Sequence, residues 1–106
     1  MSSSPFTLKV VEIIRSIPFG KVITYGGIAT MAGNRRAARQ IARILHSCSR
    51  KEKLPWHRVI NREGRISLAR QQGYDDQKEL LINEGIIFDP SDKINLDHFL
   101  WHGHKV

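Results

Sequence analysis

The sequence has little cysteine, few acidic residues and no long hydrophobic run. Cys48 is the only cysteine among 106 residues, which excludes an internal disulfide and a zinc site built from several thiolates. A single thiol favours a reduced, intracellular setting, so we expect a cytoplasmic protein, nucleoid-associated in a bacterium or nuclear in a eukaryote. No apolar run approaches the roughly 18 residues of a membrane span, and no charged-then-apolar leader is present, so we expect neither a membrane partner nor a signal peptide.

The shortage of acids leaves an excess of positive charge in one part of the sequence. Ten Asp and Glu face 17 Lys and Arg, and the formal net charge is +7. Residues 33–70 hold eleven Lys and Arg against two acids, which gives +9, whereas residues 71–106 hold three against seven, which gives −4. A concentrated positive field favours a polyanion such as a nucleic acid, and the alternative is a basic surface that is merely solvated.

Hydrophobic periodicity predicts helices near both ends of the sequence. Apolar residues from Phe6 to Ile17 recur at helical spacing, and Pro18 follows them, which predicts an amphipathic helix of about three turns. A later helix is predicted from Gln77 to Glu84, with Leu80 and Leu81 packing inward.

Two pairs of short extended segments predict small β elements. Residues 59–61 and 65–67 flank a turn and indicate an irregular hairpin. Residues 86–88 and 94–96 flank a loop that contains proline, and they predict a terminal hairpin or extended pair, after which residues 99–101 fold back on the core. The predicted fold class is therefore mainly α with small β elements.

Residues 24–47 predict a helix-turn-helix. Thr24 is a good N-cap for a short helix from Tyr25 to about Met31. A glycine then ends that helix, and Asn34 is expected to cap a second helix from Arg35 to about Ser47, followed by a charged loop at residues 49–53. Two helices joined by a tight turn, the second rich in arginine, are typical of a helix-turn-helix, although helical hairpins of this size also occur in ordinary cores.

The second predicted helix carries arginines that lack a nearby acid. Arg35, Arg36, Arg39 and Arg43 have no Asp or Glu within i,i+4 reach. Arginines so spaced repel one another unless phosphates lie close by. We therefore predict that this helix contacts DNA, and the alternative is a solvated basic helix.

Residues 55–59 read Pro-Trp-His-Arg-Val and carry the strongest motif. They resemble the active-site motif of the O6-alkylguanine-DNA alkyltransferases, in which the position of Trp56 holds the cysteine that accepts the alkyl group. A thiolate can displace carbon from oxygen, whereas the indole nitrogen only donates a hydrogen bond. A motif without its nucleophile is typical of the alkyltransferase-like members of that family, which bind alkylated DNA without repairing it.

The resemblance extends over most of the chain, roughly residues 6–88. It includes Ile-Pro-Phe-Gly-Lys-Val at 17–22, Thr-Tyr-Gly at 24–26, Ala-Gly-Asn at 32–34, Ala-Ala-Arg at 37–39 and Asn-Glu-Gly at 83–85. It implies the winged-helix-like fold of the alkyltransferase C-terminal domain, with its helix-turn-helix and a recognition helix that lies in the minor groove. We expect one such domain over residues 1–106, monomeric and without a cofactor.

The same resemblance implies a function and its partners. We expect non-enzymatic recognition of O6-alkylguanine in double-stranded DNA by nucleotide flipping. We also expect signalling to the damage-recognition proteins of nucleotide excision repair and shielding of the lesion from a true alkyltransferase. The alternatives are a helix-turn-helix regulator without damage specificity, and an enzyme that uses Cys48, which replaces the hinge asparagine of the family.

The resemblance also assigns roles to single residues. Tyr25 would press on the phosphate beside the target nucleotide, Arg39 would fill the vacated place in the base stack, and Trp56 would form a wall of the pocket for the flipped base. The alternatives are that Tyr25 and Trp56 pack in the core and that Arg39 contacts only phosphate. The predicted DNA contacts are Tyr25, Arg35, Arg36, Ala37, Arg39 and Arg43, and the predicted lesion pocket is Tyr25, Trp56, Val59 and Arg70.

Two further residues match the proton relay of the alkyltransferases, and a third, Arg58, stands beside them in the motif. In that family, residues matching His57 and Glu84 relay the cysteine proton, and here we expect them to remain as a hydrogen-bonded pair without a catalytic role. Arg58 is expected to hold the motif in place by hydrogen bonds, with a phosphate contact as the alternative. We expect no metal site, because His98, His102 and His104 match no strong ligand spacing and read better as tail histidines.

Overall fold

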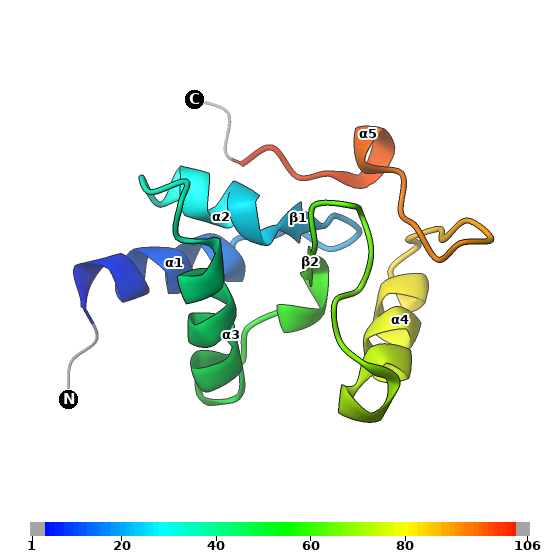
Figure 1. Ribbon diagram of the computed structural model, residues 1–106, viewed down its shortest axis with the longest axis horizontal. Helices are drawn as coiled ribbons and strands as arrows, with labels where there is room; N and C mark the ends of the chain where they lie inside the picture. Colours follow the sequence, from blue (N-terminus) through cyan, green and yellow to red (C-terminus); the bar gives the residue numbers. More distant parts are fainter. Residues whose placement is uncertain (1–3, 104–106) are drawn as a thin grey trace.

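The computed structural model describes residues 4–103 and is mainly helical, with one two-stranded sheet (Figure 1). Three helices pack together on one side of the sheet and a fourth lies on the other side. The elements, in chain order, are α1 (Pro5–Arg15), β1 (Ile23–Thr24), α2 (Tyr25–Met31), α3 (Ala38–Glu52), the 3-10 turn η1 (Trp56–Arg58), β2 (Val59–Ile60), the 3-10 turn η2 (Arg70–Gln72), α4 (Tyr74–Asn83) and α5 (Leu96–Phe99).

Strands β1 and β2 pair in parallel. The predicted irregular hairpin between residues 59–61 and 65–67 is confirmed in part: the Asn61 N–H donates to the Arg65 carbonyl at 3.0 Å, but residues 65–67 form no strand. Ile23 lies opposite Val59 and Thr24 opposite Ile60. The turn after β2 does form, because the Gly64 N–H donates to the Asn61 carbonyl at 3.0 Å. Both β2 side chains are buried, Val59 in one hydrophobic cluster and Ile60 in another, so neither face of β2 is in water.

The small sheet joins two hydrophobic clusters. Successive side chains of a strand point to opposite faces. Ile23 and Val59 therefore enter the first core cluster, which lies between α1, α2 and α3. Val22 and Ile60 enter the second core cluster, which holds Leu81 of α4. These four residues place the sheet between the two clusters.

Helix α3 is shifted relative to the prediction by about three residues at its start and five at its end. It begins at Ala38 rather than Arg35, since the Asn34 side chain accepts the Arg36 N–H and holds a turn before the helix. At the other end, the charged stretch predicted as a loop is helical to Glu52, and Lys53 follows with φ of +53°. Arg15 binds the Glu52 carboxylate at 3.0 Å, which ties this last turn to α1.

The C-terminal third agrees with the prediction in part. Leu81 is buried, but Leu80 is 40% exposed, because adjacent residues on a helix point about 100° apart. Residues 86–88 and 94–96 meet at a single antiparallel bridge, between Phe88 and Ile94. The fold-back of residues 99–101 is confirmed, since the Trp101 N–H donates to the Val22 carbonyl at 2.7 Å.

Within residues 4–103, no helix is long and apolar enough to cross a membrane. The same residues contain no group of three or more His, Cys, Asp or Glu arranged to hold a metal ion. His104 lies outside the described residues, so the structure does not test its predicted role.

Candidate nucleic-acid interface and base pocket

The Pro-Trp-His-Arg motif forms the connection between α3 and β2. The Leu54 N–H donates to the Ser49 carbonyl at 2.9 Å, which turns the chain sharply at the end of α3. Leu54 is buried and anchors the segment that follows. The 3-10 turn then places Trp56 against the first core cluster, while His57 and Arg58 extend toward the end of α4.

Glu84 is the residue around which the motif is fixed. Its carboxylate is bound by His57 Nε2 at 2.5 Å, by Arg58 Nη2 at 2.8 Å and by the Gly20 N–H at 2.9 Å. Arg58 Nη1 also donates to the Ile17 carbonyl at 2.8 Å. The predicted His57–Glu84 pair and the predicted tethering role of Arg58 are both confirmed.

The pKa of Glu84 falls well below the ordinary value. Burial alone raises this pKa, but the hydrogen bonds from Arg58, the Gly20 N–H and His57 stabilise the carboxylate more strongly. The result is a pKa of about 2 instead of 4.5. The carboxylate is therefore ionised throughout the physiological range and accepts all three hydrogen bonds there.

This lowered pKa predicts a specific acid sensitivity. Because the pKa of Glu84 is lower in the folded chain, its stabilisation is complete above about pH 4.5 and is lost as the pH falls toward 2. We expect the loss to be about 1–2 kcal/mol of unfolding free energy once solvent screening is considered. Urea unfolding at pH 6, 4 and 2.5 measures it. Glu84→Gln should flatten this acid limb, and parallel curves for the two proteins would contradict the assignment.

A cavity of about 240 Å³ lies beside Trp56. It is somewhat smaller than the roughly 300–1,000 Å³ of typical small-molecule pockets, which suits an occupant the size of one heterocycle. Three predicted pocket residues, Tyr25, Trp56 and Val59, line it. The complete lining is Tyr25, Ala42, Leu45, His46, Ser49, Trp56, Val59, Leu68, Gln72 and Gln77.

Arg70 does not line the cavity. Its guanidinium lies over the Tyr74 ring, 5.2 Å from the centroid, and pairs with Asp75 at 3.5 Å. The register of the loop could not be read from the sequence, because no periodic pattern fixes residues 68–73. A contact between Arg70 and a bound base remains a prediction.

Gln77 is a cavity residue that the sequence analysis missed. Its side chain is 3% exposed, and its Nε2 donates to the His57 carbonyl at 3.0 Å and the Val59 carbonyl at 3.1 Å. The amide thus holds both residues that flank Arg58. A signal existed, because Gln77 stands four residues before buried Leu81 and so shares its apolar helix face.

Tyr25 packs in the core and also lines the cavity. It begins α2, and its ring packs against the first core cluster. Its hydroxyl lies 3.0 Å from Ser67 Oγ, so the loop after β2 helps to hold the ring. Contact with a phosphate remains a prediction.

The predicted arginines border the cavity without entering it. The cavity side of α3 is the stripe Ala42, Leu45, His46 and Ser49. Arg39 and Arg43 each stand three residues before a member of this stripe and are exposed, so they flank its outer edge. Arg35 and Arg36 are exposed in the preceding turn, whereas the Ala37 side chain is buried, which restricts its predicted DNA contact to the backbone.

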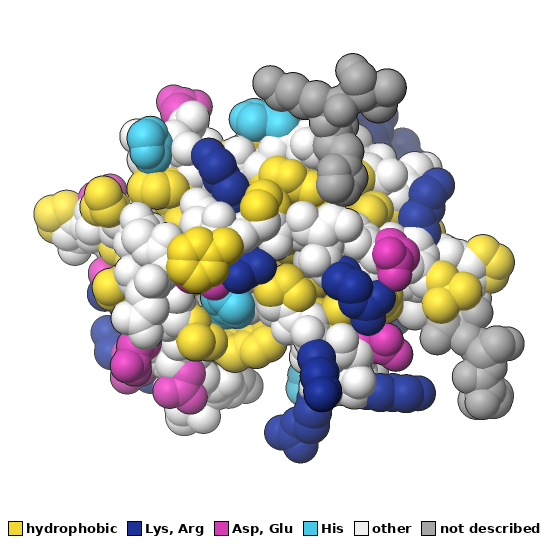
Figure 2. Space-filling view, turned by 180° about the vertical axis from the view of Figure 1, so that it is seen from behind, with side chains coloured by type: hydrophobic (Ala, Val, Ile, Leu, Met, Phe, Trp, Pro, Cys, Tyr) yellow, Lys and Arg dark blue, Asp and Glu magenta, His cyan; other side chains and the backbone are white. Residues whose placement is uncertain are grey.

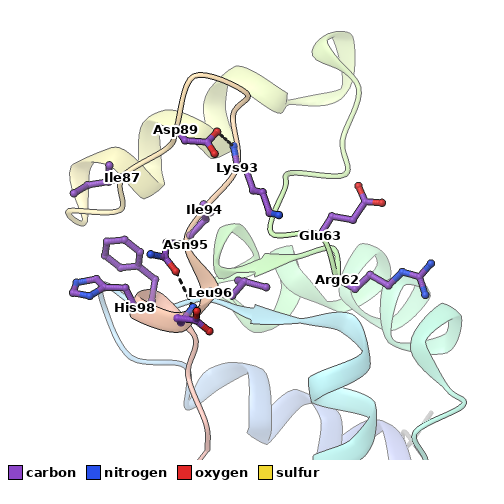
Figure 3. A pocket seen from close by; sticks show the side chains of 11 residues that line it. Arg62, Glu63, Ile87, Asp89, Lys93, Ile94, Asn95, Leu96 and His98 are labelled. Atoms are coloured by element: carbon purple, nitrogen blue, oxygen red, sulfur yellow. Dashed lines mark hydrogen bonds between the residues drawn. The ribbon is translucent and has the colours of Figure 1, made fainter.

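Charge is separated across the molecule. In Figure 2, Lys and Arg side chains gather along the lower edge, where the C-terminal end of α3 lies, and Asp and Glu side chains gather over the lower end of α4. A separate hollow of about 800 Å³ lies between the turn after β2 and the segment around α5 (Figure 3). Its lining carries both signs of charge, including Arg62, Lys93 and Asp89, and shares no residue with the Trp56 cavity.

A helix-turn-helix with exposed arginines beside a cavity that Trp56 lines is typical of a DNA-binding domain. The family model described as the DNA binding domain of 6-O-methylguanine DNA methyltransferase matches residues 5–86. The chain belongs to this family. The family assignment and fold class predicted from the sequence are thereby confirmed.

Several relatives of the chain are named for base flipping or for likeness to alkyltransferases. The DNA base-flipping protein of Escherichia coli (strain K12) is 40% identical over 97 residues, 92% of this chain and 74% of that protein. Alkyltransferase-like protein 1 of Schizosaccharomyces pombe is 38% identical over 106 residues, 95% of this chain and 98% of that protein. The crystal structure of S. pombe Atl1 with damaged DNA containing O6-carboxymethylguanine matches with a TM-score of 0.81 and 36% identity, covering 95% of this chain and 98% of that one.

Proposed function

We propose that the protein recognises O6-alkylguanine in double-stranded DNA by flipping the nucleotide from the minor groove, without transferring the alkyl group. The observation that carries the proposal is that Trp56 lines a base-sized cavity bordered by exposed arginines of α3. Relatives named for base flipping and an Atl1 complex with damaged DNA support it. The basic surface would supply the sequence-independent attraction to phosphate.

The residues around Trp56 are unsuited to alkyl transfer. The indole offers no nucleophile comparable to a thiolate. Cys48 packs against the first core cluster, with its Sγ 3.8 Å from Ser47 Oγ, and is not among the residues that line the cavity. His57 Nε2 is held by the ionised Glu84, so this pair positions the motif and has no thiol to activate.

Arg39 and Tyr25 would offset the free-energy cost of extruding the base. Extruding a base costs a few kcal/mol of unstacking and unpairing. O6 alkylation removes the guanine N1 proton and weakens its pairing, so a damaged base costs less to extrude. We infer that Arg39 stacks in the vacated place and that Tyr25, at the start of α2 beside the cavity, presses on the adjoining phosphate.

We further propose that the bound protein acts as a signal. A monomer that covers the O6 substituent would shield it from a true alkyltransferase. The same complex would recruit the damage-recognition proteins of nucleotide excision repair. We propose that this takes place in the cytoplasm at the nucleoid, or in the nucleus of a eukaryote.

Two duplexes that differ by a single methyl group test the function. We expect the full chain to bind a duplex with one O6-methylguanine at least about tenfold more tightly than the same duplex with guanine, a difference of 1.4 kcal/mol. Fluorescence anisotropy at fixed salt measures both dissociation constants. Equal constants would overturn the proposal.

Two further outcomes separate the alternatives. Transfer of a labelled methyl group to the protein would contradict the non-enzymatic half of the proposal, and its loss in Cys48→Ala would identify the acceptor. Enrichment of one undamaged sequence from random DNA would favour a helix-turn-helix regulator instead.

A further inference from the structure

A second hollow adjoins the base cavity at Trp56. It measures about 790 Å³ and shares His46, Ser49 and Trp56 with the base cavity. Its complete lining is His46, Ser47, Ser49, Arg50, Lys53, Leu54 and Trp56. Because the two hollows meet at three shared residues, a group projecting from a base past Trp56 would enter the second hollow.

The second hollow is positively charged. Arg50 and Lys53 contribute two cations to its lining, and no Asp or Glu lines it. Neither cation forms an ion pair with any residue in the described range 4–103. The one acid nearby in sequence, Glu52, is engaged by Arg15 at 3.0 Å.

Lys53, one of these two cations, directly follows the last turn of α3. Lys53 adopts a left-handed conformation at the end of α3, with its N–H directed to the Arg50 carbonyl at 3.4 Å. The helix C-terminus adds about half a negative charge, which opposes an anion. Two full positive charges on Arg50 and Lys53 exceed it.

We propose that this hollow is the subsite for the O6 substituent, and that Arg50 and Lys53 make the protein prefer anionic substituents over neutral ones of equal size. The inference rests on the proposed function and adds the chemical class of the adduct. A carboxylate on the substituent would gain one or two exposed ion pairs. Pairs of this kind correspond to about a three- to tenfold gain in affinity at low salt.

Matched adducts test the preference. The full chain is titrated with duplexes that carry one O6-carboxymethylguanine, its uncharged analogue O6-carbamoylmethylguanine, O6-methylguanine or guanine. We expect the carboxymethyl duplex to bind three- to tenfold more tightly than the carbamoylmethyl duplex in about 50 mM salt. We expect this ratio to shrink in about 300 mM salt, since exposed charges are screened.

Matched lysine variants assign the effect to the hollow. Lys53→Gln should reduce the carboxymethyl-to-carbamoylmethyl ratio toward one. Lys51→Gln removes the same charge two residues away, outside the lining, and should leave the ratio unchanged. A ratio lowered equally by both variants would show general attraction to the basic surface and overturn the proposal.

The same titration separates the two levels of inference. The wild-type protein could prefer O6-methylguanine over guanine and yet bind the carboxymethyl duplex no more tightly than the carbamoylmethyl duplex. That result would overturn the anionic subsite and leave the proposed function standing. No preference for any O6-alkylguanine over guanine would overturn both. If Lys53→Gln and Arg50→Gln both left the carboxymethyl-to-carbamoylmethyl ratio at its wild-type value, the assignment of the preference to these two residues would be overturned.

Discussion

Replacing Glu84 by alanine is expected to lower the free energy of unfolding by about 3–5 kcal/mol. The carboxylate is 7% exposed and offsets the charge of Arg58, which is itself largely buried. Removing one partner of a buried pair leaves the other charge uncompensated, which is the costly case. The Gly20 N–H would lose its acceptor as well. Urea denaturation followed by far-UV circular dichroism measures the change.

Glu79→Ala provides the matched control for this loss. Glu79 is an exposed acid of α4, the helix that Glu84 follows, and it forms no ion pair within residues 4–103. Its replacement should alter the free energy of unfolding by about 0.5 kcal/mol or less. If the two variants lost similar stability, the central position of Glu84 in the fold would be wrong.

Replacing Arg39 by alanine is expected to weaken binding to a lesion duplex by about 1–3 kcal/mol, roughly 5- to 150-fold. This is the range for a side chain that stacks on bases, and Arg39 is exposed near the start of α3, where it borders the cavity. Its loss would leave the gap in the base stack unfilled. Binding to undamaged DNA should fall much less. Anisotropy titrations on paired lesion and guanine duplexes measure both effects.

Arg36→Ala provides the comparison for a phosphate contact. Arg36 is exposed in the turn before α3 and carries the same charge. We expect it to weaken binding to both duplexes alike and to reduce the salt slope by about one. An identical pattern for the two variants would contradict the stacking role of Arg39.

Local signals predicted the elements that depend on neighbouring residues. The spacing of apolar residues gave α1, and Thr24 was correctly predicted as the cap of α2, since its hydroxyl accepts the Gly27 N–H at 2.9 Å. The pairing of Ile23 with Val59 could not be predicted, because partners 36 positions apart share no local pattern. The start of α3 was misjudged because Asn34 can cap a helix or close a turn, and sequence alone does not decide between them.

Some features of the site could likewise be predicted from the sequence and others could not. The His57–Glu84 pair was predicted by resemblance to a family rather than by spacing, since 27 residues separate the two. The place of Trp56 in a cavity wall depended on the same resemblance. The second hollow could not be predicted from the sequence. It forms where Lys53 follows the end of α3, whereas the helix was predicted to end at about Ser47.

The long sequence separation of the Glu84 contacts has a consequence for biosynthesis. The carboxylate reaches back 64 residues to Gly20 and 26 residues to Arg58. A nascent chain that has left the ribosome only as far as Ser67 carries all four arginines of the basic turn and helix, but neither Gln77 nor Glu84 to fix the wall of the cavity. Such a chain can be drawn to any polyanion, including the RNA around it, before it can discriminate a lesion. Selectivity is therefore acquired only after Glu84 has left the ribosome.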